Sequence, residues 1–260
     1  ARGFFMDDDF SGLIVTYKGE GFSIPFIWVK AFEGHNAGYG DFNDMDVDYY
    51  GLLPSFNLGD GISINPFIFW ATSDDISGWV NTNGLYYHPL DSKVLGLTGA
   101  LPLNTELDIW WYGLNADAKF GPLSLWFTGI YEDGEMAIPG ATDVDIEAYL
   151  IAIGGAYDMG MFDIHGQYFY ASGDDDWTDD ELEAFWIPSQ GDSQGQSYYW
   201  AEIMGFGIFD DSSPSNTPGD KITNVWAANL GTKIKPMDKL TVTVDLWYAE
   251  LAEERATNVD

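Results

Sequence analysis

The sequence has no cysteine, few basic residues and no long apolar run, and each shortage excludes a class of protein. Without cysteine, the chain forms no disulfide, no thiolate metal site and no cysteine nucleophile. Lysine and arginine number 10 against 42 acidic residues, a formal charge of −32, which would repel a phosphate backbone and excludes nucleic acid as a partner. No apolar run reaches about 18 residues, which excludes a transmembrane helix. A barrel strand needs only about 9–11 alternating residues and is not excluded.

Histidine is also scarce, and this argues against an enzyme. The three histidines are His35, His88 and His165, and no G-x-S-x-G or H-E-x-x-H pattern occurs. A catalytic nucleophile needs a base within hydrogen-bond reach, and no sequence pattern supplies such a pair. We therefore predict that the protein is not an enzyme. We expect no cofactor other than Ca²⁺ or Mg²⁺ at acidic loops.

What the sequence does contain is alternation of apolar and polar residues. In residues 239–251, KLTVTVDLWYAEL, the side chains of Leu240, Val242 and Val244 fall on one face of an extended chain and Thr241 on the other. A soluble sheet would turn the apolar face toward a core. A membrane strand would turn it toward lipid and the polar face toward a water-filled lumen.

Ten such segments pair as five hairpins. Glycine-containing turns such as Gly59-Asp60-Gly61 and Gly121-Pro122 join the partners. Most segments have 10–15 residues, longer than the roughly 5–6 of soluble sheets and long enough to cross a bilayer at a tilt. The hairpins are 12–19 with 22–32, 47–58 with 62–72, 106–120 with 123–132, 144–157 with 161–172, and 221–234 with 239–251.

Short turns alternate with long connections, so an antiparallel order puts every long connection at the same end. The long connections are 33–46, 73–105, 133–143 and 173–220, and most acidic clusters fall in or beside them. We predict an all-β fold, an antiparallel up-and-down transmembrane β-barrel with short turns at one end and long acidic loops at the other. It has ten visible strands, or twelve if 79–103 contributes two more.

Aromatic residues gather near the ends of the predicted strands, where amphipathic rings suit a girdle at the membrane surface. The alternative is that aromatic residues are simply good strand formers. The clusters are Trp110-Trp111-Tyr112, Tyr168-Phe169-Tyr170 and Trp247-Tyr248.

The whole-chain pattern resembles bacterial outer-membrane porins. The stretches DDDFSGLIVTYKGEGFSIPFIWVKAFEG (7–34) and YGLNADAKFGPLSLWFTGIYEDG (112–134) resemble large porin or alginate-export-like barrels of Gram-negative bacteria. The resemblance implies passive passage of small solutes. Alginate exporters line their pores with arginine, whereas this chain has only Arg2 and Arg255, neither within a predicted strand. Alginate is therefore not the expected cargo.

Strand parity places the start of the first predicted strand and the end of the tenth on the long-loop side. The termini of single-chain bacterial barrels are expected on the periplasmic side. We therefore expect residues 1–260 to be a single β-barrel domain and an internal part of a longer chain. A ten-stranded barrel in an unusual orientation is the alternative. The longest connection, 173–220, either folds inward as a constriction or stays an external loop.

If the apolar parity faces lipid, the opposite parity lines the pore. The predicted lining has a negative bias, which favours cations, although such residues could also serve only to hydrate the lumen. The predicted pore-lining residues are Asn65, Glu106, Asp108, Asp163, His165, Gln167, Asn229, Lys233, Thr241, Thr243 and Asp245.

The acidic run DDDWTDDELE at 174–183 suggests a divalent cation site. It does not have EF-hand spacing, because Asp179 stands where glycine is needed and Phe185 where the bidentate glutamate should be. A solvated charge run is the alternative, and ions bridging external acids to lipopolysaccharide are a further one. The candidate ligands are Asp174, Asp175, Asp176, Asp179 and Asp180.

The function predicted from the sequence is an outer-membrane porin that passes small hydrophilic solutes with a preference for cations. Its expected partners are outer-membrane lipid, lipopolysaccharide and the solutes, and a homotrimer is considered because trimers are common among porins. One alternative is a soluble secreted β-protein that binds carbohydrate through its tryptophans. Another is a barrel that acts as an adhesion surface or as a sheath around a partner protein.

Overall fold

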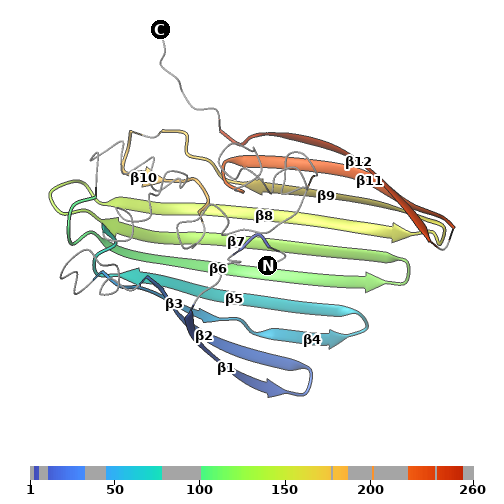
Figure 1. Cartoon of the computed structure of the whole chain (residues 1–260), viewed down its shortest axis with the longest axis horizontal. Helices are drawn as coiled ribbons and strands as arrows, with labels where there is room; N and C mark the ends of the chain where they lie inside the picture. Colours follow the sequence, from blue (N-terminus) through green and yellow to red (C-terminus); the bar gives the residue numbers. More distant parts are fainter. Residues whose placement is uncertain are drawn as a thin grey trace, which may run out of the picture.

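The structure, a computed structural model, describes residues 3–5, 11–32, 45–77, 101–176, 178–186, 201, 222–237 and 239–253. In these residues the chain forms one sheet (Figure 1). Its strands are β1 (Ser11–Gly19), β2 (Phe22–Phe32), β3 (Val47–Leu52), β4 (Ser55–Gly59), β5 (Ile62–Ser73), β6 (Glu106–Phe120), β7 (Leu123–Ala137), β8 (Val144–Asp158), β9 (Phe162–Ala171), β10 (Glu181–Leu182), β11 (Val225–Met237) and β12 (Leu240–Leu251).

The sheet is antiparallel along its main path and follows the order of the chain. Neighbours run β1-β2-β3-β5-β6-β7-β8-β9-β11-β12, so consecutive long strands alternate in direction. The five short turns lie together on the right of Figure 1. All ten segments predicted from alternation are strands, and the prediction of short turns at one end is confirmed.

The third predicted strand differs, because 47–58 is divided into β3 and β4. Pro54 lies at the division and has no N–H to donate to a neighbouring strand. Beyond the break, β4 still pairs with β2 and β5. The second short strand, β10, pairs in parallel with β8. These two pieces bring the number of strands to twelve, whereas residues 79–100 of the segment expected to add two strands lie outside the described residues.

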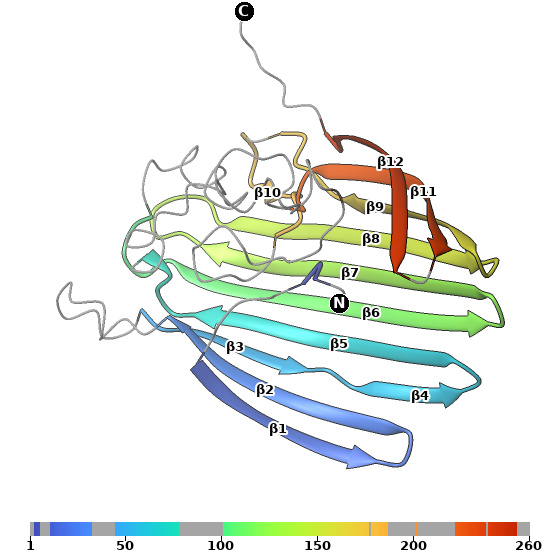
Figure 2. The same cartoon turned by 45° about the vertical axis from the view of Figure 1, so that its right-hand side comes forward.

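The two faces of the sheet differ in what covers them. On one face, here called the inner face, Phe4, Phe5, Phe185 and Trp186 pack into a single apolar cluster with residues of the strands. Figures 1 and 2 both show the segment of Gly3–Phe5 lying across this face of β6 and β7. The rings of Phe4 and Phe169 are 5.8 Å apart. The opposite face, here called the outer face, carries a broad set of exposed apolar side chains.

The polarity of each face inverts along a single strand, and β8 shows this clearly. Near the long connections, β8 directs Val144 and Ile146 inward, where they are buried, and Asp145 and Glu147 outward. Further along, the exposed outer residues become apolar, as with Ile153. The first part follows the pattern of a soluble sheet, whereas the second part follows the pattern of a membrane strand.

The two ends of the strand order are separate edges. Among the described residues no strand pairs with the second side of β1 or of β12. Figures 1 and 2 show these two strands at opposite borders of the sheet. In the described part of the chain, no helix has the length and apolar character to cross a bilayer.

Candidate functional site

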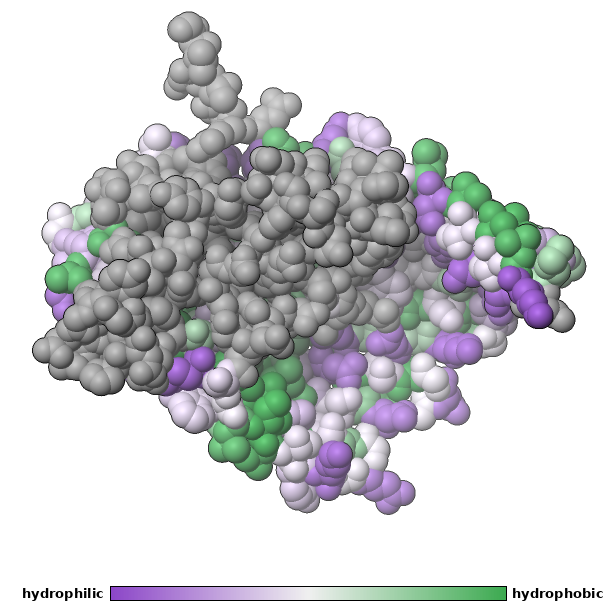
Figure 3. All heavy atoms as spheres, viewed as in Figure 1, coloured by the Kyte–Doolittle hydropathy of each residue, from purple (hydrophilic) through white to green (hydrophobic). Residues whose placement is uncertain are grey.

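A belt of exposed apolar side chains crosses the outer face from β1 to β12. On β12 the apolar parity that alternation predicted is exposed, and Leu246 has 76% of its surface accessible. In Figure 3 hydrophobic residues follow the line of β12 along the upper right rim. Soluble monomers rarely expose contiguous apolar patches of more than a few hundred Å². A belt across ten strands therefore needs an apolar environment.

Aromatic rings, here called the girdle, border the belt on the side of the long connections. Trp70 and Trp110 stack at 5.2 Å between ring centroids, and Tyr50 and Tyr112 continue the stack on either side. Further along, Trp226 lies 6.1 Å from Tyr168 and 5.4 Å from Tyr248. Each aromatic cluster expected to form a girdle is divided between the faces, because alternation sends Trp111, Phe169 and Trp247 inward.

The N–H and O–H groups of the girdle donate hydrogen bonds to carboxylates that lie on the side of the girdle away from the belt. Asp108 accepts from Trp110 Nε1 at 2.9 Å and from Trp70 Nε1 at 3.1 Å. The Tyr131 hydroxyl donates to Glu147 at 2.9 Å. At a membrane surface, amphipathic rings place an apolar body toward lipid and a polar tip toward water, and this arrangement has that form.

A second belt margin lies near the short turns. Tyr17, Phe22 and Phe56 form a chain of ring contacts there, and Tyr157 is exposed on β8. Tyr149 and Tyr157 are eight residues apart on β8, roughly 26 Å along an extended strand and less in height once the strand tilts. This length is close to the ~25 Å apolar band of outer-membrane barrels.

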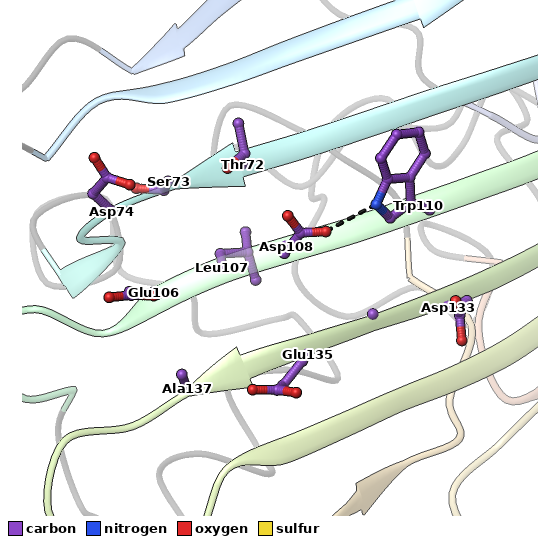
Figure 4. A pocket seen from close by; sticks show the side chains of 11 residues that line it. Thr72, Ser73, Asp74, Glu106, Leu107, Asp108, Trp110, Asp133, Glu135 and Ala137 are labelled. Carbon is purple, nitrogen blue, oxygen red and sulfur yellow. Dashed lines mark hydrogen bonds between the residues drawn. The ribbon is translucent and has the colours of Figure 1, made fainter.

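An acidic pocket of about 550 Å³ lies on the outer face beyond the girdle (Figure 4). Glu106, Asp108, Asp133 and Glu135 line it. The expectation that Glu106 and Asp108 share a face with the other predicted lining residues is wrong. The register pairs Asp108 with Glu135 and alternates it with buried Leu107 and Ile109, which places Asp108 on the outer face, outside the belt.

On the inner face, the half near the long connections is filled by apolar side chains. Trp186 is 1% exposed and packs against Trp111 at 5.4 Å between centroids. Trp111 Nε1 donates to the Trp186 carbonyl at 3.0 Å, and the Trp186 amide donates to Glu132 Oε2 at 2.9 Å. Glu132 is itself fully buried. Residues 182–186 of the longest connection thus lie against the inner face, and whether they constrict a passage stays a prediction.

The other half of the inner face, nearer the short turns, is polar. The register places nine of the predicted lining residues on this face, and those of β9, β11 and β12 lie side by side. That they line an open passage stays a prediction. The nine are Asn65, Asp163, His165, Gln167, Asn229, Lys233, Thr241, Thr243 and Asp245.

His165 joins two carboxylates on this polar half. Its Nδ1 lies 2.8 Å from Asp163 Oδ1 and its Nε2 lies 2.8 Å from Asp245 Oδ1. Asn229 Nδ2 donates to the same Asp245 oxygen at 2.6 Å. Both histidine contacts are hydrogen bonds to carboxylates only when both ring nitrogens carry a proton, because a neutral imidazole has one N–H. Sequence parity predicted the shared face of Asp163, His165 and Asp245 but not their direct contact.

In the acidic run after β9, several carboxylates accept hydrogen bonds from backbone amides two residues further along the chain. Asp174 Oδ1 accepts from the Asp176 amide at 3.1 Å, and Asp176 Oδ1 accepts from the Thr178 amide at 3.0 Å. Asp179 accepts from the Glu181 amide in the same way, while Asp175 and Asp180 are exposed. Among the described residues no group of three or more acidic or histidine side chains is arranged to hold a metal ion. Binding of Ca²⁺ or Mg²⁺ by this run stays a prediction.

Glu183 is the last residue of this run, and its environment disfavours the ionised carboxylate. Burial raises the pKa of Glu183, and the nearby carboxylates of Asp175 and Asp174 raise it further. The acids of this connection therefore repel one another.

No family model and no curated protein matches the sequence. Among solved structures, OccK8 (OprE) of Pseudomonas aeruginosa is similar with 12% identity and a TM-score of 0.48, over 92% of this chain and 56% of that protein. The toluene transporter TodX of Pseudomonas putida has 10% identity and a TM-score of 0.34, over 92% of this chain and 68% of TodX. A Pseudomonas aeruginosa FadL homologue has 11% identity and a TM-score of 0.24, over 92% and 68%. The chain thus spans little more than half the length of OccK8.

Proposed function

We propose that the chain forms the wall of a transmembrane β-barrel in the bacterial outer membrane, through which small hydrophilic solutes pass with a preference for cations. The observation that carries this proposal is the inversion of polarity along the strands. At the aromatic girdle the outer residues change from acids to apolar side chains, as from Glu147 to Ile151 and Ile153 on β8. A sheet surrounded by water on its outer face would keep polar residues there along its whole length.

The polarity of the inner face supports the proposal that solutes pass along it. Polar residues become more frequent at the level of the belt, as on β7, where Ile130 is followed toward the short turn by Thr128, Trp126 and Ser124 on the inner face. Asp163 and Asp245 add negative charge, and rings of acids favour cations in a pore. The alternative of a soluble carbohydrate-binding protein would leave the belt in contact with water.

The test is conductance in a planar bilayer under a KCl gradient. We expect stepwise conductance with a reversal potential displaced toward that of K⁺, and a smaller displacement for Asp163→Asn. Asp145→Asn removes the same charge from the outer face of β8 and is the matched control. Insertion without conductance would contradict the open passage, and an anion-selective reversal potential would contradict the cation preference.

A further inference from the structure

Residues of two neighbouring rows on the inner face line a cavity of about 320 Å³ between β7 and β12. Cross-strand pairing aligns the residues of each row over five strands. The first row is Trp126, Gly154, Gln167, Asn229 and Trp247, and the second is Ser124, Ala156, His165, Gly231 and Asp245. The first row thus has a tryptophan at each end and two amide side chains, Gln167 and Asn229, between them. In the neighbouring second row, His165 and Asp245 lie on either side of Gly231.

A glycine in each row makes room for side chains that line the cavity. A Cβ atom at Gly154 would overlap the indole of Trp126, which lies over this position. A Cβ atom at Gly231 would overlap both Asp245 Oδ1 and His165 Nε2, so the hydrogen bond between these side chains passes over the glycine. The positions of Trp126, His165 and Asp245, which line the cavity, therefore depend on the absence of side chains at Gly154 and Gly231.

Two side chains at the cavity, Asn229 and Asp245, offer acceptor oxygens to a ligand. Asn229 Oδ1 is buried and has no hydrogen-bond partner in the described part of the chain. Asp245 receives its hydrogen bonds from His165 and Asn229 on Oδ1, and a carboxylate has acceptor capacity on both oxygens. The site is therefore complementary to a ligand that brings donors.

The summed charge of Asp163, His165 and Asp245 is negative in either protonation state of the histidine. Two carboxylates and an imidazolium sum to −1, and with a neutral imidazole the sum is −2. Lys233 lies on the same face in the adjacent row, outside the cavity lining, and Asp158 lies in that same row. The indoles of Trp126 and Trp247 add electron-rich surfaces that attract cations.

We propose that this cavity binds a small organic cation with an ammonium group, held by Asp245 and the Asn229 carbonyl and flanked by the two indoles. The volume is at the lower end of the ~300–1,000 Å³ range of ligand pockets, which suits a small solute. This inference deepens the proposed function and rests on it, because it takes the inner face as the side that solutes meet. It names organic ammonium compounds as the solute class.

The test is calorimetric titration of the full chain in detergent micelles with benzylammonium, using benzyl alcohol as the neutral probe of similar size. We expect benzylammonium to bind at least about tenfold more tightly than benzyl alcohol, and Asp245→Asn to weaken benzylammonium by about tenfold or more, the effect of losing a charged hydrogen bond. Asp133→Asn, which removes a carboxylate from the outer face, is the matched control and should bind as the unmodified chain does. Asn229→Leu tests the carbonyl separately, and circular dichroism shows whether each variant is folded.

Equal binding of the two probes, or unchanged binding in both folded Asp245→Asn and Asn229→Leu, would overturn the inference. The titration needs no conductance, so it separates this inference from the proposed function. Binding without conductance would support the site while contradicting the open channel. Conductance without selective binding would still support the proposed channel but would overturn the proposed binding site.

Discussion

Replacement of Ile153 by arginine tests directly what surrounds the outer face. Ile153 is 52% exposed and stands midway between Tyr149 and Tyr157 on β8. If lipid surrounds this position, the arginine costs about 2–4 kcal/mol near the bilayer midplane. That cost corresponds to roughly a 30- to 700-fold change in the unfolding equilibrium constant. If water surrounds it, an exposed substitution should change stability by no more than about 0.5 kcal/mol.

The matched control is Asp145→Arg, on the same strand and the same face but on the other side of the girdle. The assay is equilibrium unfolding by guanidinium from lipid vesicles, followed by tryptophan fluorescence. We expect Ile153→Arg to lower the free energy of unfolding by the amount given above and Asp145→Arg to leave it nearly unchanged. Equal effects of the two substitutions would refute the membrane assignment of the belt.

Two further predictions concern the segment that covers the inner face. Trp186→Ala should lower the free energy of unfolding by about 3–5 kcal/mol, because a fully buried indole is lost, and should raise single-channel conductance, because the indole fills the inner face. Glu183 has a raised pKa, so its folded form binds a proton more tightly than its unfolded form, and stability falls as the pH rises above the ordinary value of 4.5. Glu183→Gln should therefore stabilise the chain at neutral pH and lose this advantage below that value, as measured by denaturant unfolding across pH. A stabilisation that does not change with pH would contradict this explanation.

The strands were predictable from the sequence because a period of two identifies them without any long-range information. The face of each residue was less predictable. The sequence argument assumed that the apolar parity faces lipid along a whole strand, and this fails on β6, where Asp108 and Trp110 share the outer face. Under the proposed membrane assignment, β6 continues past the girdle into water, where the polarity rule reverses. Trp110, two residues after Asp108 on the same face, marks this reversal and is the signal that would have located Asp108 correctly.

The contact between His165 and Asp245 was not predictable from the sequence, for a different reason. Within the β8–β9 hairpin, residues equally far from the turn pair with each other, so the pairing of His165 with Ala156 follows from the turn. The register between β9 and β11 has no such local rule, because a long connection separates them. That register alone brings Gly231 opposite His165 and, through β12, Asp245 within reach. Trp126 and Trp247 were missed as flanks of one cavity for the same reason.

The two sheet edges determine what the functional unit must contain. In the bilayer each unpaired backbone N–H or C=O group costs several kcal/mol, so only closed barrels span it with strands. β1 runs toward the short turns and β12 runs away from them, and both present apolar residues outward, as with Val15 and Val244. Each edge therefore suits an antiparallel neighbour whose apolar residues also face outward. The conducting form is expected to have both edges paired, either with each other or with further strands. The conductance and titration experiments address that closed form, in which the polar rows of β9, β11 and β12 face an enclosed lumen.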